Sequence, residues 1–135
     1  AHRIAIANAG ACAAPDMISG LVVHELAQYP AHARAAVANA FALRAGIGVL
    51  GIVAGSGAER AGLRIDDEIL AVRGQSVEDL GAWTRRTPSY ERVDRFHRHL
   101  SQALERGPAE LLVRRGGAHL RLTLSGQAGC GGLVK

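Results

Sequence analysis

Two short apolar segments with a very short helix between them constrain the fold of this 135-residue chain more than any other feature. Residues 48–54 (GVLGIVA) form an uninterrupted apolar run, which is typical of a buried strand. Residues 67–73 (DEILAVR) predict a second strand. Alternation along it leaves two options for the inward face: Ile69 with Ala71, or Leu70 with Val72. The chain is therefore expected to place two sheet strands around a helix of one or two turns.

The short helix has a recognisable start and end. Ser56 can accept a hydrogen bond from the backbone N–H of Glu59, and the Glu59 side chain can reach back, which is the spacing of a capping box. Gly62 can adopt the left-handed backbone angles that end a helix. These signals confine the helix to residues 57–61.

The second half of the chain predicts a long helix followed by a hairpin. Residues 88–106 follow a potential cap at Thr87, begin with a proline, and carry apolar residues three and four positions apart. This stripe consists of Val93, Phe96, Leu100 and Leu104. Residues 111–115 and 118–124 then flank Gly116-Gly117, a pair that suits a two-residue turn with positive φ. We expect one face of this hairpin to be buried.

The first part of the chain gives weaker signals. Residues 19–29 predict either a short helix or a strand, because their periodicity does not distinguish the two. The Ala-rich run after Pro30 predicts a helix with proline in its first turn. We therefore interpret residues 1–40 as an N-terminal extension packing on a domain of residues 41–124, with residues 125–135 as a Gly-rich tail.

Composition argues against several classes of protein. The hydrophobic fraction of 48% is that of a globular protein, and no apolar run approaches the ~20 residues that a membrane-spanning helix needs. The net charge of +4 comes with 15 Arg and a single Lys. Acidic residues are interleaved with the basic ones, and no nucleic-acid-binding motif is present. We expect no membrane span and no nucleic-acid partner.

The two cysteines lie near opposite ends of the chain. A disulfide between Cys12 and Cys130 would close a long loop and contribute on the order of 4–5 kcal/mol in the chain-entropy model. It would also indicate an oxidising compartment such as a periplasm. The alternative is two unrelated buried thiols.

The chain contains a near match to a zinc motif but no complete one. Residues 24–28 (HELAQ) resemble H-E-x-x-H, yet Gln28 stands where the second histidine ligand is required. Ser56 is better explained as a helix cap than as a nucleophile, and Asp67 as a structural residue than as a calcium ligand. We therefore predict no catalytic residue, no metal site and no cofactor in this chain.

Residues 49–77 resemble the core signature of a PDZ domain, in the form found in bacterial envelope proteases. The matching positions are Gly55, Ser56, Ala58, Ala61, Gly62, Leu63, Asp67, Ile69, Leu70, Val72 and Gly74. Gly57, Asp66 and Arg73 stand where Pro, Gly and Asn are usual. The resemblance implies an α+β fold: a small, partly open β-barrel or sandwich with one short and one long helix, here with an N-terminal extension that contains a helix.

The flanking segments add a weaker resemblance. SGLVVHELAQY before the domain and GCGGLVK after it are similar to parts of envelope zinc metallopeptidases that carry a PDZ-like domain ahead of the catalytic domain. This implies that the parent protein is a protease of the periplasm or cell envelope, with a zinc metallopeptidase as the candidate class.

PDZ domains bind an extended peptide by strand addition, in a groove between a strand and the long helix. A loop of apolar-Gly-apolar type donates N–H groups to the terminal carboxylate of the peptide. The resemblance implies the following peptide-binding residues here: Phe41, Ala42, Leu43, Arg44, Val93 and His97.

The expected function is therefore a non-catalytic peptide-binding or regulatory domain. Its expected partners are C-termini or unfolded segments of proteins and the catalytic domain of the parent protease. Two alternatives stay open. One is a structural or docking domain whose groove is occupied by its own N-terminal extension; the other is an enzyme, for which the sequence offers no constellation of titratable residues.

Overall fold

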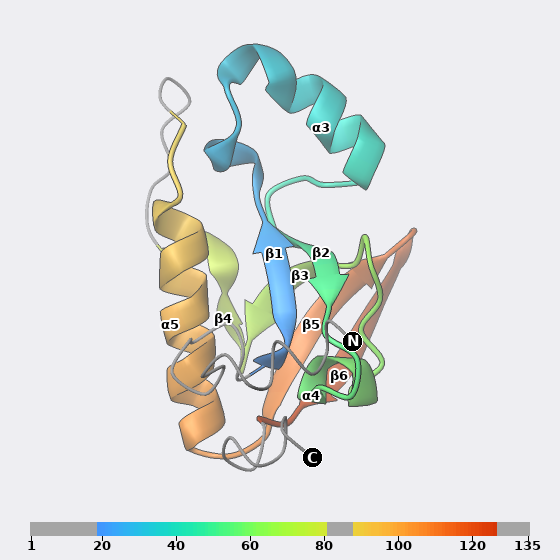
Figure 1. Ribbon diagram of the computed structural model, residues 1–135, viewed down its shortest axis with the longest axis vertical. Helices are drawn as coiled ribbons and strands as arrows, with labels where there is room; N and C mark the ends of the chain where they lie inside the picture. Colours follow the sequence, from blue (N-terminus) through green and yellow to red (C-terminus); the bar gives the residue numbers. More distant parts are fainter. Residues whose placement is uncertain (1–18, 81–87, 127–135) are drawn as a thin grey trace.

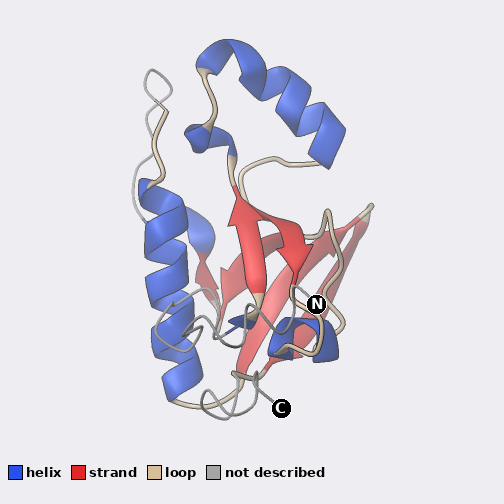
Figure 2. Ribbon diagram, in the orientation of Figure 1, coloured by secondary structure: helices blue, strands red, loops and turns tan. Residues whose placement is uncertain are grey.

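The computed structural model describes residues 19–80 and 88–126, which form one open antiparallel sheet with helices around it (Figure 1; Figure 2). The strands are β1 (Leu21–His24), β2 (Ile47–Ile52), β3 (Glu68–Val72), β4 (Gln75–Ser76), β5 (Ala109–Arg115) and β6 (Ala118–Leu124). Their order in the sheet is β1-β2-β3-β5-β6, and β4 pairs with β3. Every pairing is antiparallel. The α+β class expected from the sequence is confirmed.

Within the described residues, three α-helices lie around this sheet. They are α3 (Arg34–Phe41), α4 (Gly57–Arg60) and α5 (Glu91–Glu105). Three short 3-10 helices join them to the strands: η2 (Leu26–Gln28), η3 (Ala31–Ala33) and η4 (Val77–Leu80). Helix α5 runs along the side of the sheet where β1 and β4 lie, and α3 extends beyond the end of β1 (Figure 1). None of the helices in the described part is long and apolar enough to cross a membrane.

The β2–α4–β3 unit confirms the local signals of the sequence. Ser56 Oγ accepts a hydrogen bond from the backbone N–H of Glu59 at 3.3 Å. The return bond is shifted by one residue, because the Glu59 carboxylate accepts from the N–H of Gly55 at 2.8 Å. Gly62 follows the helix with a φ of +90°, the left-handed conformation expected after it.

Strand β3 takes neither of the two predicted alternations. Ile69 and Val72 are both 0% exposed, although they are three residues apart. The pairing of β3 with β5 shifts register between Ile69 and Ala71. This irregularity inserts Leu70 as an extra residue, so the inward face changes parity within the strand.

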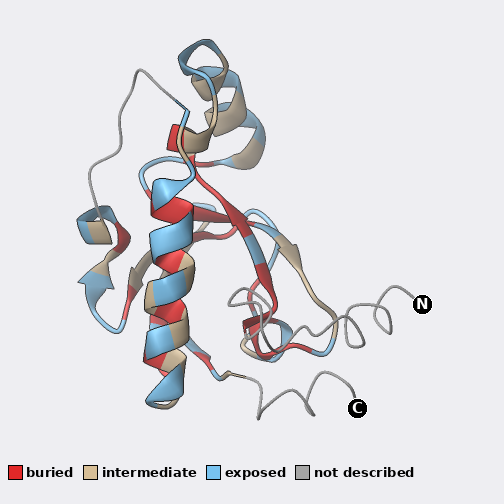
Figure 3. Cartoon of the chain, turned by 60° about the vertical axis from the view of Figure 1, so that its left-hand side comes forward, coloured by how far each residue is buried: buried red, intermediate tan, exposed pale blue. Residues whose placement is uncertain are grey.

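The long helix α5 presents its apolar stripe to the core, as expected. Phe96 and Leu100 are 0% and 1% exposed, and Figure 3 shows buried residues recurring along one side of the helix. The helix begins at Glu91, three residues later than predicted. The backbone N–H of Ser89 donates instead to the carbonyl of Ala27 at 2.8 Å, which ties this segment to the N-terminal part of the chain. The predicted cap at Thr87 lies outside the described residues.

The N-terminal part of the domain differs from the predicted boundary at residue 41. Residues 21–24 form β1, which is an integral strand of the sheet, and Leu21 and Val23 belong to the core at 1% and 8% exposed. Pairing with the apolar β2 buries this segment, which could not be foreseen from its own periodicity. The helix expected after Pro30 is present, with a 3-10 turn before α3.

Several predictions fall on residues that the structure does not describe. Cys12 lies in residues 1–18 and Cys130 in residues 127–135, so the disulfide stays a prediction. Occupation of a peptide site by residues 1–18 also stays a prediction.

Candidate functional site

Strand β1 lies at one end of the sheet. Within residues 19–80 and 88–126 it pairs with β2 along one edge and with no strand along the other. In Figure 1, β2 lies on one side of β1 and α5 on the opposite side. An edge strand exposes backbone N–H and C=O groups that can pair with another extended chain. The edge of β1 that faces α5 is therefore the first element of the candidate site.

The backbone of β1 directs alternate residues toward its two edges. The carbonyl of Gly20 accepts a hydrogen bond from the N–H of Val53 at 2.8 Å, so Gly20 faces β2. The register shift between Val22 and Val23 places the extra residue, Leu50, in β2 and not in β1, so the alternation along β1 continues. Leu21 and Val23, offset from Gly20 by one and three residues, therefore direct their backbone groups away from β2. In agreement, the N–H of Leu21 donates to the side chain of Ser19 at 3.2 Å rather than to β2.

The turn that leads into β1 requires glycine for two reasons. Gly20 has a φ of +79°, in the left-handed region that favours glycine. A Cβ atom on Gly20 would lie 2.1 Å from Cβ of Ser56, the residue that caps α4. The start of β1 is thus fixed against the start of α4. The periodicity of residues 19–29 did not distinguish a helix from a strand; the glycine followed directly by Leu-Val-Val was the available signal.

A buried ion pair holds the other end of β1 against α5. The Arg92 guanidinium lies 3.2 Å from the Glu25 carboxylate, and each side chain is 3% exposed. Arg92 also donates to the carbonyls of Val77 at 3.1 Å and Ala45 at 3.3 Å. Burial raises the pKa of Glu25, while the N–H of Ala27 and the positive charge of Arg92 act in the opposite direction.

The residues of the incomplete zinc motif have structural partners. His24 is 1% exposed, and its Nδ1 atom lies 2.7 Å from the hydroxyl oxygen of Tyr29. Burial lowers the pKa of His24, so its imidazole is neutral at pH 7. Gln28 accepts a hydrogen bond from the backbone N–H of Glu25 at 3.1 Å. In the described part of the chain, no group of three or more His, Cys, Asp or Glu side chains is placed to hold a metal ion.

Helix α5 contributes two of the predicted site residues on one flank. At about 100° per residue, Val93 and His97 lie only about 40° apart around the helix axis. Val93 is 8% exposed and joins the core, whereas His97 is half-buried. The structure thus keeps this predicted pair together, beside the side chains that fill the core.

The predicted carboxylate-binding loop, residues 41–44, uses its N–H groups within the chain. The N–H groups of Ala42 and Leu43 both donate to the carbonyl of Ala38. The N–H groups of Arg44 and Gly46 donate to the buried carboxylate of Glu68, at 2.7 and 2.8 Å. The Glu68 carboxylate also pairs with Arg114. The loop does bind a carboxylate, but one that the protein itself supplies.

The strand that follows this loop is not an edge strand. β2 is hydrogen-bonded to β1 on one side and, at Ile47 and Gly48, to β3 on the other, so it lies inside the sheet rather than at its end. Phe41 packs edge-on against the His24 ring, and Leu43 is 1% exposed. Ala42 has a φ of +52° as the C-cap of α3. The candidate edge is therefore that of β1, a strand that contains none of the predicted site residues.

Comparison with known proteins identifies the fold. No protein-family model matches the chain, and no curated protein matches it significantly. Among solved structures, the HtrA3 PDZ domain bound to a phage-derived ligand (FGRWV) is similar with a TM-score of 0.52 and 19% identity, covering 79% of this chain and 82% of that one. The HtrA-type protease AlgW with a decapeptide is similar with a TM-score of 0.53 and 23% identity.

The similarity to AlgW covers 80% of this chain but only 28% of the AlgW chain. At these identities the likeness shows the fold, so the predicted PDZ-like architecture is confirmed. The similar structures come from HtrA-type proteases, and they give no support to a zinc metallopeptidase as the parent protein.

Proposed function

We propose that this chain is a non-catalytic PDZ domain of a larger protease and that it captures C-terminal or extended peptide segments on the edge of β1. The observation that carries the proposal is the position of β1, which is paired with β2 on one edge only in the described residues and has α5 on the other side. The HtrA3 PDZ domain and AlgW, which share the fold, are both solved with a peptide.

Strand addition supplies the affinity. A peptide that enters antiparallel to β1 pairs its backbone with Leu21 and Val23, whose N–H and C=O groups face away from β2. Specificity comes from peptide side chains that meet α5, where Val93 offers an apolar contact and His97 a polar one. Because such a peptide buries little surface, we expect dissociation constants in the micromolar range or weaker.

The turn before β1 is the proposed position of the peptide's terminal carboxylate. The N–H of Leu21 is held by Ser19 Oγ in the free chain and becomes available when that side chain rotates away. An incoming carboxylate is the stronger acceptor, because hydrogen bonds to charged groups are stronger than those to a hydroxyl. Amidation of the peptide C-terminus should then weaken binding about tenfold.

The parent protein is the second part of the proposal. Since the chain covers only 28% of AlgW, we place the catalytic domain elsewhere in a longer protease and the domain beside it as a substrate-recruiting or regulatory element. We propose the cell envelope as its location. Fractionation of the source cells with an antibody against this domain tests the location directly.

The binding proposal is tested by NMR titration of the labelled chain with a library of peptides that have free or amidated C-termini. We expect amide shifts to concentrate at residues 19–24 and on the Val93–His97 flank of α5. His97→Ala should weaken peptide binding about three- to tenfold, whereas His99→Ala, a matched change on the opposite flank, should leave it unchanged. Shifts centred on residues 44–46, or no saturable binding across the library, would contradict the proposal.

A further inference from the structure

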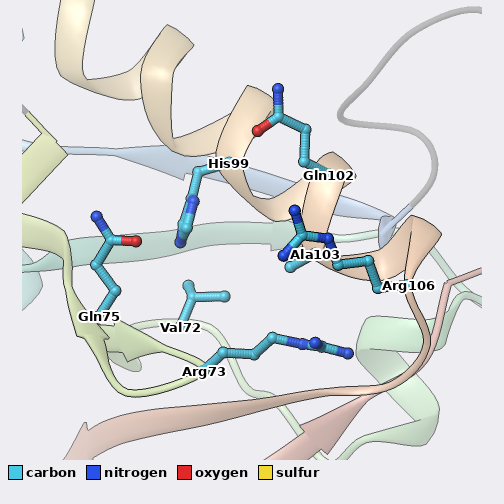
Figure 4. Close-up of a pocket in the computed structure, with 7 residues that line it drawn as sticks. All are labelled: Val72, Arg73, Gln75, His99, Gln102, Ala103 and Arg106. Atoms are coloured by element: carbon cyan, nitrogen blue, oxygen red, sulfur yellow. The ribbon is translucent and has the colours of Figure 1, made fainter.

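A pocket of about 480 Å³ lies on the other flank of α5, between this helix and the turn from β3 to β4 (Figure 4). This volume is in the range of sites for small organic ligands. Polar residues line both of its walls: Arg73 and Gln75 on the strand side, His99 and Gln102 on α5, and Arg106 at the C-cap of that helix. Val72 and Ala103, both buried, complete the lining.

This pocket is separate from the proposed peptide site. His99 and His97 are two residues apart, which places them about 160° from each other around the helix axis. Because His99 lines the pocket, His97 lies on the opposite flank of the helix. The two flanks of α5 serve two different surfaces, and a ligand in the pocket does not occupy the edge of β1.

The pocket carries positive charge that no carboxylate in the described part of the chain neutralises. Neither Arg73 nor Arg106 forms an ion pair there, and no acidic residue lines the pocket. Arg73 donates from one nitrogen, Nη2, to the carbonyl of Pro108 at 3.0 Å. The Glu110 backbone contacts Arg73, but the Glu110 carboxylate pairs with Arg121, at 3.2 Å, and not with Arg73.

A backbone hydrogen bond holds the main chain of Arg73, one of the residues that supply hydrogen-bond donors to the pocket. The N–H of Arg73 donates to the carbonyl of Glu110 at 2.8 Å, and Arg73 has a φ of +50°. In Figure 4 the side chains of His99 and Gln75 extend toward each other, while the Arg106 guanidinium turns back over Ala103. His99 Nε2 has no hydrogen-bond partner in the described residues. Figure 4 thus places the His99 imidazole and the Gln75 amide at one end of the pocket and the guanidinium groups of Arg73 and Arg106 at the other, while the Gln102 amide points away from it.

We propose that this pocket binds the phosphate group of an organic phosphate monoester. Guanidinium groups recognise phosphate through paired, charge-assisted hydrogen bonds, and two of them line the pocket, which an imidazole and an amide also line. The pocket is larger than a phosphate ion, so it also accommodates part of an organic body. A soluble phosphate ester and a phospholipid headgroup share this chemistry.

The test uses the full chain and two probes. The first is glycerol 3-phosphate, with glycerol as the uncharged control, followed by NMR. Saturable amide shifts at residues 72–75 and 99–106 are expected, and none with glycerol. The second probe is a phosphatidylcholine vesicle with and without phosphatidic acid, followed by co-sedimentation. Saturation by the soluble ester alone identifies a free ligand; sedimentation only with phosphatidic acid identifies a headgroup.

Matched substitutions separate a built site from general charge attraction. Arg73→Asn combined with Arg106→Ala should weaken binding of the responding probe by at least about tenfold; Asn is chosen because it tolerates left-handed angles. Arg98→Ala removes the same charge from an exposed position of α5 that does not line the pocket, and should change binding by less than about twofold. Arg106→Ala alone repeats the test if the double variant unfolds.

Two results would overturn the proposal. One is the absence of saturable binding to both probes. The other is an equal loss of binding in Arg98→Ala and Arg106→Ala, which would indicate attraction to the net charge of the protein rather than a site. Either result leaves the peptide proposal untouched, because that proposal depends on β1 and the opposite flank of α5.

Discussion

The guanidinium of Arg92 and the carboxylate of Glu25 meet at 3.2 Å in the protein interior and join the end of β1 to the first turn of α5. The two residues are 67 positions apart in the sequence. Their contact fixes the spacing between the edge strand and the helix, which are the two elements of the proposed peptide site. A buried pair of this kind makes any change of one partner costly, because the other charge is then left without compensation.

Arg92→Met should therefore lower the free energy of unfolding by about 3–5 kcal/mol, since it leaves the Glu25 carboxylate buried without its cation. Urea denaturation measures the loss. The matched control is Arg95→Met on the same helix, where Arg95 pairs with Glu91 at side-chain exposures of 43% and 56% and should matter by less than about 1 kcal/mol. Similar losses in the two variants would show that the ion pair with Glu25 has no special role.

Glu68→Ala should destabilise the domain by at least about 3 kcal/mol, because it removes the acceptor for two backbone N–H groups and the partner of Arg114. Glu110→Ala, which breaks an exposed pair with Arg121, is the control and should cost less than about 1 kcal/mol. If Glu68→Ala is as mild as its control, the loop at residues 44–46 does not depend on this carboxylate.

Gly20→Ala should be far more damaging than Gly55→Ala, although both glycines have a φ of +79°. An added Cβ at Gly55 meets nothing within 4 Å, so only the backbone strain of about 1–2 kcal/mol applies. At Gly20 the added atom overlaps Ser56, and we expect a loss of at least about 3 kcal/mol. Thermal unfolding gives both values.

Combining Gly20→Ala with Ser56→Gly provides the internal check on this prediction. The second change removes the overlapping atoms and costs only a few tenths of a kcal/mol as a cap. Partial recovery of stability is expected. No recovery would mean that the contact with Ser56 is not the cause.

The free energy of unfolding should fall as the pH is lowered through about 6.5, because burial lowers the pKa of His24 in the folded protein. The unfolded chain, with an ordinary histidine pKa, then binds the proton first and gains stability. Glu25 acts in the opposite sense, since its raised pKa makes proton uptake at lower pH favour the folded state.

Comparing the wild type with His24→Asn isolates the histidine, because Glu25 and the other groups titrate in both. Between pH 5.5 and 7.5, the slope of the free energy of unfolding against pH should be more positive in the wild type than in the variant. Because one histidine binds at most one proton, the difference in slope cannot exceed about 1.4 kcal/mol per pH unit. Urea denaturation across this range measures it, and equal slopes in the two proteins would rule out a contribution from His24.

The sequence alone determined the features that depend on residues a few positions apart. The cap of Ser56 with Glu59 and the left-handed Gly62 follow from hydrogen bonds and sterics within one or two turns of chain. The β5–β6 hairpin at Gly116 follows for the same reason, as does the apolar stripe of α5. These local signals were enough to indicate the PDZ architecture.

The tertiary structure decided which strand carries the free edge. Residues 19–29 are ambiguous by themselves, and only pairing with β2 makes Leu21–His24 a strand at the end of the sheet. A tertiary contact also constrains residue 57, where this chain has glycine and the PDZ pattern usually has proline. An added Cβ there would lie 1.9 Å from the carbonyl oxygen of Ser125, a contact between residues far apart in the chain.

For the proposed peptide site, the sequence predicted the residues on the helix but not the strand that carries the free edge. Helix periodicity placed Val93 and His97 together, because that relationship is set by 3.6 residues per turn. The carboxylate that fills the loop at Arg44 and Gly46 comes from Glu68, on a different strand. Strand pairing and buried ion pairs join residues through space rather than along the chain, so no spacing in the sequence encodes them, and the folded structure alone determines which backbone groups are left to bind a partner.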